Sequence, residues 1–359
     1  MDHGEGMVGR GPEMSVNRSL FGAFLLLSVG MSNPGAGAEF SNLFVFGDSL
    51  SDSGNNAAAL APNVTPVPIS GNSFIPIFPY ASGRYTNAQV WAQLLASSLG
   101  VSAAPSLLGG TDYAFGGALT GPVSQLTPPS LEAQVALFLS QHGGAAPSDA
   151  LYVIEGGGEN ARAALVAIGD CAGILSCVSG VIQSAAADLV TDIGTIDGEL
   201  ERAGAKNIVV WNVPDIGTTP AVHSSGALAS AFGTTITSAM NQALLGAIGN
   251  DPDIELFDAF SLLNEAVAHP SDFGLSNVTD ACAQFIGCDP SQYLFWDGIH
   301  PTSAAEPFIS DAILSLAERV PEPSSLGLLA AALAGLGLIG GPRPRLTGQG
   351  KPDLDRVCR

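Results

Sequence analysis

Short apolar runs of three to five residues recur along the chain, separated by longer segments in which apolar residues repeat at helical spacing. The short runs lack the apolar–polar alternation of a half-exposed strand, so they predict strands that are covered on both faces. The longer segments predict helices that cover those faces in a mostly parallel sheet with right-handed crossovers. The predicted strands are 43–46, 151–154, 207–211 and 255–257, and the predicted helices are 90–99, 130–141, 180–203 and 227–248.

The first apolar run breaks abruptly into Gly47, Asp48, Ser49 and Leu50. This break leaves Ser49 at the carboxyl end of a strand, where open α/β sheets bind ligands. A hydroxyl group alone is a weak nucleophile and needs a neighbouring base.

The segment that could supply that base lies about 250 residues later, at Asp297 and His300. Their spacing lets one short turn aim the imidazole at Ser49 while the carboxylate holds the other ring nitrogen.

Together these two segments resemble the first and last blocks of the GDSL/SGNH hydrolase family, Gly-Asp-Ser-Leu and Asp-x-x-His. Residues 83–91 and 112–118 are similar to further family segments, in the same order, so the resemblance extends over about residues 41–318. It implies a flavodoxin-like, three-layer α/β/α sandwich and an esterase or lipase with Ser49, Asp297 and His300 as catalytic residues. Such a triad requires no metal or other cofactor.

The resemblance also implies donors for the oxyanion: the backbone N–H groups of Ser49 and Gly117 and an asparagine side chain from a Gly-x-Asn-Asp block. In this chain the ungapped asparagine position is Glu159, and Asn160 follows it. An ionised carboxylate would repel the developing negative charge. Either the glycine run shifts by one residue so that Asn160 donates, or burial keeps Glu159 protonated, or activity is reduced. We expect Asn160 to be the donor.

The composition limits the classes of molecule that this protein can bind. The net charge is -21 with only 12 Lys and Arg residues, which leaves no basic surface for nucleic acid. Two pairs of cysteines, Cys171 with Cys177 and Cys282 with Cys288, are close enough in sequence to form disulfides in an oxidising compartment, and Cys358 is left over.

Both ends of the chain carry export patterns. Residues 14–38 have an arginine, an apolar run and a small-residue end, which is typical of a cleaved secretory signal. Residues 320–346 contain Pro-Glu-Pro, an apolar stretch and two arginines, similar to the PEP-CTERM sorting tag of Gram-negative bacteria. The resemblance implies transient membrane anchoring and processing by a sorting protease, although the run is shorter than the roughly 20 residues that span a bilayer, and a buried helix is the alternative.

The sequence therefore predicts four parts: an extension and signal peptide (1–38), a hydrolase domain (39–319), a sorting segment (320–346) and a polar tail (347–359). We expect an exported protein of the cell envelope or medium that cleaves lipid esters, short acyl esters or acetyl groups on glycan. The alternative, favoured by Glu159, is a catalytically weakened envelope protein with the same fold that binds glycan or matrix.

Overall fold

The computed structural model describes residues 40–60, 80, 82–122, 124, 127–249 and 251–318. The predicted signal peptide, the sorting segment, the polar tail with Cys358 and nearly all of residues 61–81 lie outside these residues. None of the helices in the described ranges is long and apolar enough to cross a membrane.

Four parallel strands form the central sheet in the order β1 (Leu43–Phe46), β2 (Leu151–Ile154), β3 (Asn207–Trp211) and β4 (Ile254–Phe257). In the register, Leu43 lies opposite Leu151 and Ile208 opposite Ile254. All four predicted strands are confirmed, the last starting one residue earlier than expected. The strands are buried because helices cover both faces of the sheet.

A short segment extends the sheet beyond β1. The backbone N–H of Tyr113 donates to the carbonyl of Val45 at 2.7 Å, and the N–H of Phe115 donates to the carbonyl of Gly47 at 3.1 Å. Asp112 pairs with Val45 in a parallel bridge. If this segment is counted as the second strand of the chain, the strands lie side by side in the order 2-1-3-4-5. This is the flavodoxin-like order, with its switch point at β1. The carboxyl end of β1 is therefore where this topology opens a crevice.

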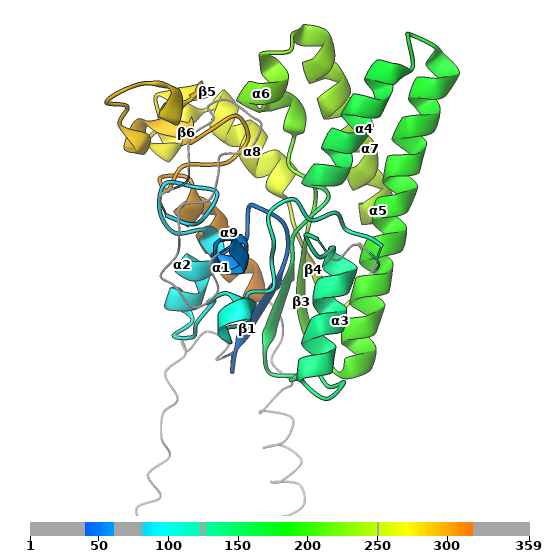
Figure 1. The fold of residues 1–359 in the computed structure, drawn as a ribbon, viewed down its shortest axis with the longest axis vertical. Coiled ribbons are helices and arrows are strands. Elements are labelled where there is room, and N and C mark those ends of the chain that lie inside the picture. The colour runs from blue at the N-terminus through cyan, green and yellow to red at the C-terminus, as the bar shows by residue number, and fades with distance from the viewer. Residues whose placement is uncertain are drawn as a thin grey trace, which may run out of the picture. The chain divides into compact units, whose positions relative to one another are not determined.

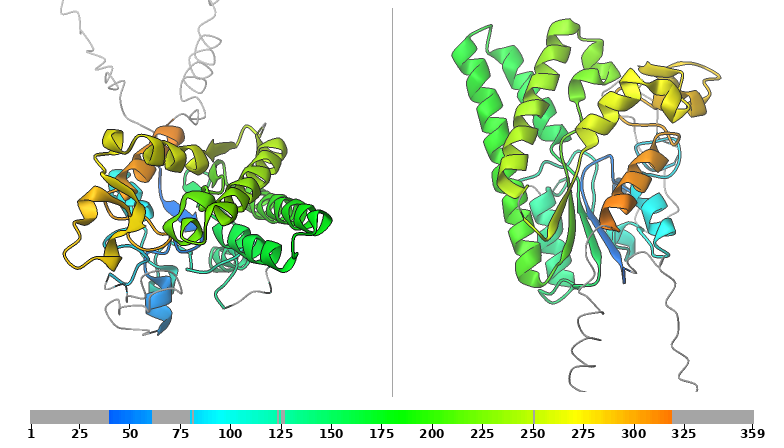
Figure 2. Two further views of the ribbon diagram at one scale, coloured as in Figure 1. Left: turned by 90° about the horizontal axis from the view of Figure 1, so that it is seen from above. Right: turned by 180° about the vertical axis from the view of Figure 1, so that it is seen from behind.

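The side chains of each strand alternate between two hydrophobic cores, as the period of two requires. Phe44 and Phe46 of β1 lie in one core with residues of α3 (Leu131–Gln141), α4 (Gly158–Asp170), α5 (Leu175–Ala203) and α7 (Ala227–Ile248). Leu43 and Val45 lie in the second core, on the other face, with residues of α2 (Trp91–Ser98) and α9 (Glu306–Ala317). Figures 1 and 2 show the helices on the two sides of the sheet. The predicted three-layer α/β/α sandwich with a mostly parallel sheet is confirmed.

The predicted helices are confirmed. The helix 227–248 has the predicted ends, and the largest shift is in α5, which begins at Leu175 instead of residue 180. The sequence prediction missed several elements. They are α4, α9, α1 (Asn55–Leu60), α6 (Pro220–His223), α8 (Ala259–Ala268) and a two-stranded sheet of β5 (Asn277–Ala281) and β6 (Tyr293–Phe295).

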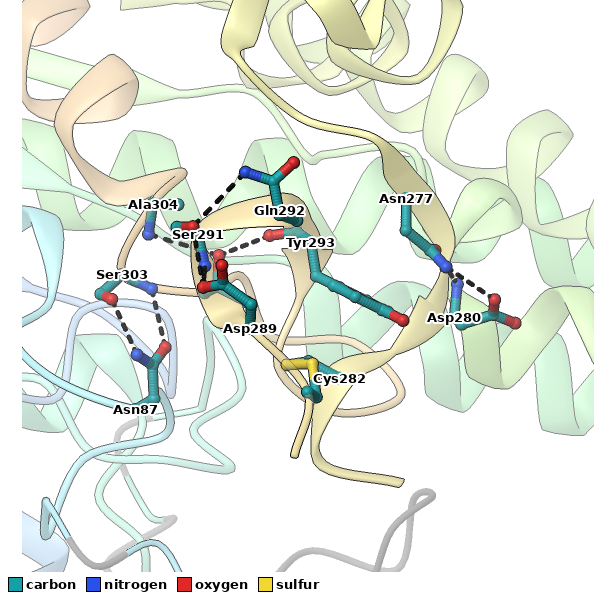
Figure 3. The surroundings of a disulfide bond; sticks show 12 residues. Asn87, Asn277, Asp280, Cys282, Asp289, Ser291, Gln292, Tyr293, Ser303 and Ala304 are labelled. Carbon is teal, nitrogen blue, oxygen red and sulfur yellow. Dashed lines mark hydrogen bonds between the residues drawn. A yellow bond between two sulfur atoms is a disulfide. The ribbon is translucent and has the colours of Figure 1, made fainter. Parts of the chain in front are cut away.

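Both predicted disulfides are confirmed. Cys171, which follows α4, bonds to Cys177 in the first turn of α5, and Cys282 bonds to Cys288 between β5 and β6. Figure 3 shows the second region, where the Asp289 side chain accepts from Ser291. Such local bonds and the disulfide order the irregular segment that leads to Asp297.

Candidate active site

The turn after β1 is fixed from both sides of Gly47. The Gln134 side chain accepts the Gly47 N–H and donates to the Gly47 carbonyl, each at 2.9 Å. A Cβ at Gly47 would lie 2.7 Å from the carboxylate of Glu155, so no larger residue fits. Ser49 follows this turn with only 6% of its surface exposed. The sequence therefore holds the Ser49 hydroxyl in one place.

Two buried acids support the same turn. Glu155, at the end of β2, accepts the Asp48 N–H at 3.0 Å and the Ser51 hydroxyl at 2.9 Å. Burial, as the largest cause, raises the pKa of Glu155 to about 7. Burial also raises the pKa of Asp48 well above its ordinary value, and the charges of Glu155 and Glu159 add to the shift. Sequence reasoning missed Glu155 because an acid after a strand has no local signature.

Asp52 joins the nucleophile turn to the glycine block. One carboxylate oxygen accepts the N–H groups of Gly54 and Asn55 at 2.8 and 2.6 Å. The other accepts the N–H of Gly116 at 3.0 Å. Burial raises the pKa of Asp52 to about 6. These bonds set the position of the Gly116–Gly117 peptide relative to Ser49.

The Gly116–Gly117 peptide is oriented by Asn56, whose amide donates to the Gly116 carbonyl at 3.0 Å. Since carbonyl and N–H point in opposite directions across a trans peptide, the Gly117 N–H faces away from Asn56. Within the described residues, neither this N–H nor that of Ser49 has a hydrogen-bond acceptor. Both are donors that an oxyanion could use.

The glycines themselves are required here. Gly117 has a φ of 86°, and a Cβ at Gly116 would lie 2.2 Å from the ring of Tyr85.

Asp297 and His300 lie in a turn after β6. One Asp297 oxygen, Oδ1, accepts the N–H groups of Ile299 and His300 at 2.8 and 2.7 Å. The other, Oδ2, lies 2.8 Å from His300 Nδ1. His300 Nε2 lies 2.7 Å from the Oγ of Ser49. The structure thus brings together all three residues that the sequence singled out, and it buries both Asp297 and His300.

Tyr80 and Tyr85 complete the surroundings of the imidazole. The Tyr80 hydroxyl donates to Asp297 Oδ2, and the Tyr85 ring centroid lies 5.2 Å from that of His300. Burial alone would raise the pKa of Asp297, but the charge of His300 and the hydrogen bonds from His300 and Tyr80 outweigh it and hold that pKa below its ordinary value. Asp297 therefore stays ionised. Neither tyrosine was predicted from the sequence, although Tyr85 lies in the segment 83–91 that is similar to the family.

The comparison with family models matches residues 43–313 to "GDSL-like Lipase/Acylhydrolase". The chain belongs to this family. It is 31% identical over 346 residues to esterase EstA of Pseudomonas aeruginosa, covering 83% of this chain and 50% of that protein. It is 26% identical to lipase 1 of Photorhabdus luminescens, covering 84% of this chain and 54% of that one. The chain thus spans about half the length of these relatives.

The third donor position of this GDSL-like chain differs from the prediction. Both ends of the Asn160 amide are engaged by Thr120: Oδ1 accepts its N–H at 3.2 Å and Nδ2 donates to its hydroxyl at 3.0 Å. Asn160 is also absent from the residues that line the cavity beside Ser49, whereas Glu159 lines it. The geometry therefore argues against Asn160 as a donor to the oxyanion.

Glu159 is paired instead. It lies in the first turn of α4, and its side chain forms an ion pair at 2.5 Å with that of Arg162, three residues further along the helix. Glu159 Oε1 accepts a hydrogen bond from the Arg162 guanidinium, so the contact that the structure gives this side chain is as an acceptor and not as a donor to an oxyanion.

An apolar cavity of about 120 Å³ opens beside Ser49 and His300. It extends away from them between α8, α9 and β6. Its walls are almost entirely hydrocarbon and aromatic side chains, including Leu50, Trp211, Phe257, Leu263, Phe273 and Phe308. The chamber can hold an apolar chain whose reacting end lies at the Ser49 hydroxyl.

Proposed function

We propose that this chain is an exported serine hydrolase that cleaves carboxylic esters through Ser49, His300 and Asp297. The observation that carries the proposal is the continuous line of contacts from Ser49 Oγ to His300 Nε2 at 2.7 Å and from His300 Nδ1 to Asp297 at 2.8 Å. Nucleophile, base and orienting acid in this order are the arrangement that acyl transfer uses.

In this mechanism Ser49 attacks the ester carbonyl while its proton passes to His300 Nε2. Asp297, kept ionised, holds Nδ1–H and stabilises the imidazolium that forms. The same proton then goes to the departing alcohol, leaving an acyl group on Ser49. Water, activated by His300 in turn, releases the acid and restores the serine.

The tetrahedral intermediate is stabilised by two backbone donors, the N–H groups of Ser49 and Gly117. The third position is taken by Glu159, whose negative charge is offset by Arg162. Losing one donor in an acyl-transfer enzyme costs about 2.7 to 4 kcal/mol of transition-state stabilisation. We therefore expect a slower esterase than one with a complete set of three donors.

The substrate we propose is an ester of a short to medium acyl chain. The apolar cavity beside Ser49 favours a hydrocarbon chain over an acetyl group, which would leave most of it empty. An engineered cavity of about 150 Å³ holds a benzene molecule, so a chamber of slightly smaller volume suits about four to six carbons. Neither a metal nor another cofactor takes part in this scheme.

Export is part of the proposal. Two disulfides support it, since such bonds persist in oxidising compartments. The signal-like residues 14–38 and the tag-like residues 320–346 suggest secretion followed by anchoring or release at the envelope of a Gram-negative cell. Fractionation of the full chain and of a chain ending at residue 319 tests this, because only the first should be found with membranes.

A second candidate function is a weakened envelope protein that keeps the fold and binds glycan or matrix. The specific observation in its favour is the ion pair of Glu159 and Arg162 at the cavity rim. The two candidates differ in the reactivity of Ser49, since only an activated serine reacts readily with a fluorophosphonate.

The test of the first candidate is release of p-nitrophenol from acetyl, butyryl, hexanoyl and decanoyl esters. Ser49→Ala should lower kcat by a factor on the order of 10⁴ or more, while Ser271→Ala, at an exposed serine, should leave it unchanged. Butyryl and hexanoyl esters should give the highest kcat/KM. Equal rates for wild type and Ser49→Ala would exclude the assignment.

A further inference from the structure

Three carboxyl groups converge at the end of the sheet opposite to Ser49. Asp197 and Glu201 lie four residues apart on α5 and so share one face of that helix. Asp251 lies between α7 and β4. One carboxylate oxygen of each residue lies within 4.8 Å of those of the other two. In Figure 1 this is the lower end, where α5 finishes and β4 begins.

Asp197 is the unusual member of this group. Only 7% of the residue is exposed, and its Oδ1 is buried without a hydrogen-bond partner among the described residues. A buried polar atom that lacks a partner costs about 1 to 3 kcal/mol, and more when it is charged. Nearly all such atoms in folded proteins are satisfied by protein, water or an ion. The Asp197 Oδ1 atom is therefore available to a ligand.

The neighbouring basic side chains do not neutralise the three carboxylates. Lys206 is 2.8 Å from Asp253, which occupies it. Burial, followed by the charges of Glu201, Asp251 and Asp253, raises the pKa of Asp197 to about 7. The charged side chains that act on Asp197 and Glu201 are Asp251, Asp253, Arg202 and Lys206. The balance around Asp197 is thus strongly negative.

Local hydrogen bonding fixes the third carboxylate. Oδ1 of Asp251 accepts the N–H of Asp253 at 3.0 Å, which orients the side chain in its turn. The Asp253 carbonyl accepts the N–H of Ile208 at 3.3 Å, so this turn is tied to the start of β3. The carboxylates therefore come from two segments that the sheet holds in place.

We propose that Asp197, Glu201 and Asp251 bind a divalent cation, and that the cation is of the calcium type. All the donors are oxygens, which suits hard cations and not zinc or copper. Glu201 and Asp251 are partly exposed, which leaves room for the water ligands that complete a calcium shell. Calcium also tolerates the irregular geometry of three carboxylates from a helix and a turn.

The site has a structural role. It joins the last turns of α5 to the segment that leads into β4, and it lies at the edge of the sheet remote from the triad. Bound cation should stabilise the fold by mass action and leave ester hydrolysis unchanged. The competing explanation is that Asp197 is simply protonated and binds nothing.

The full chain is first freed of metal with a chelator. It is then titrated with CaCl₂ at pH 8 in a calorimeter. Wild type should bind one Ca²⁺ with a Kd on the order of 10⁻⁴ to 10⁻³ M, the range of extracellular calcium modules. Tm should rise with CaCl₂ over the same range. MgCl₂ should bind more weakly, because magnesium demands near-octahedral geometry.

The informative variant is Asp197→Asn combined with Glu201→Gln, which removes two charges without removing side-chain volume. It should weaken Ca²⁺ binding at least about tenfold and abolish the Ca²⁺-dependent rise in Tm. The control is Asp188→Asn on the exposed face of the same helix, where the carboxylate accepts from Ser184. The control should bind Ca²⁺ as wild type does.

Without Ca²⁺ the double variant should melt higher than wild type, because it has lost buried repulsion. Should it fail to fold, the single Glu201→Gln replaces it with the same expected loss of binding. No saturable binding to folded wild type at about 10 mM CaCl₂, well above the expected Kd, would overturn the proposal. Equal affinity of wild type and variant would overturn it as well.

Discussion

The substitution Glu155→Gln isolates the energetic cost of the acid beneath the nucleophile turn. Glu155 is 1% exposed, and one of its oxygens accepts from the Asp48 N–H and the Ser51 hydroxyl. Burial raises its pKa from 4.5 to about 7. The folded protein therefore holds this proton more tightly than the unfolded chain does.

This difference in pKa sets the direction in which the free energy of unfolding changes with pH. Between pH 4.5 and 7 the folded state binds more protons than the unfolded state, so the free energy of unfolding falls as pH rises. At about 1.36 kcal/mol per pKa unit, a shift of roughly 2.5 units makes the loss about 3 kcal/mol above pH 7. Glutamine has the same shape and keeps an acceptor oxygen, but it does not titrate. At low pH, the neutral hydrogen bonds of the glutamine should make the free energy of unfolding of Glu155→Gln about 1 kcal/mol lower than that of wild type.

The assay is urea unfolding at pH 4.5, 6, 7 and 8.5 for wild type, Glu155→Gln and the exposed control Glu265→Gln. Relative to wild type, Glu155→Gln should gain about 3 kcal/mol between the lowest and highest pH. Glu306, a buried acid whose pKa is set by its burial and by the hydrogen bond from the Trp91 N–H, titrates in both proteins and cancels in the difference. Asp48 should strengthen the effect, because removal of the Glu155 charge lowers its pKa. Parallel curves for wild type and Glu155→Gln would refute the reasoning.

Three further substitutions test the site. Asn160→Ala should lower the free energy of unfolding by about 1 to 3 kcal/mol through its lost bonds to Thr120, measured by urea unfolding. It should also leave kcat/KM within about threefold of wild type, and a hundredfold loss would restore Asn160 as a donor. Glu159→Asn, which supplies an amide at the third position, should raise kcat for butyryl ester by up to about 10²; an unchanged or lower kcat would contradict the incomplete oxyanion hole. Ala266→Leu, which fills part of the apolar cavity, should shift the preference of kcat/KM from hexanoyl toward acetyl ester, and an unchanged preference would place the acyl chain elsewhere.

The sheet could be predicted from the sequence because its strands carry unusually clear signals. Residues 43–46, 151–154 and 207–211 are apolar runs that end in polar or glycine-rich segments, and burial on both faces demands that pattern. β5 lacks this pattern because most of its residues are partly or fully exposed, and β6 is only three residues long. Helix α4 escaped prediction because its start lies in a glycine run, and glycine is a poor helix former.

The candidate site was predictable only where a short motif encodes it. Ser49, Asp297 and His300 lie in such motifs, and the structure brings them together. The third donor depended instead on the rotation of α4: one residue along a helix turns the side chain by about 100°, so Glu159 and Asn160 point in different directions. A shift of one position is therefore not available once α4 begins at Gly158.

The supporting acids were beyond sequence reasoning for a different reason. Asp52 and Glu155 act through contacts with residues far along the chain, such as Gly116 and Asp48. Both acids are buried because β1, β2 and the segment 112–115 pack together, and no local sequence pattern predicts this packing.

The central claim is that His300 activates Ser49, and covalent labelling tests it most directly. The chain is treated with a fluorophosphonate, and the modified peptide is located and timed by mass spectrometry for wild type, Ser49→Ala and His300→Ala. We predict a single adduct on Ser49 in wild type, no adduct in Ser49→Ala and a strongly slowed reaction in His300→Ala. An unlabelled wild type, or labelling of Ser49 at an equal rate without His300, would contradict the account.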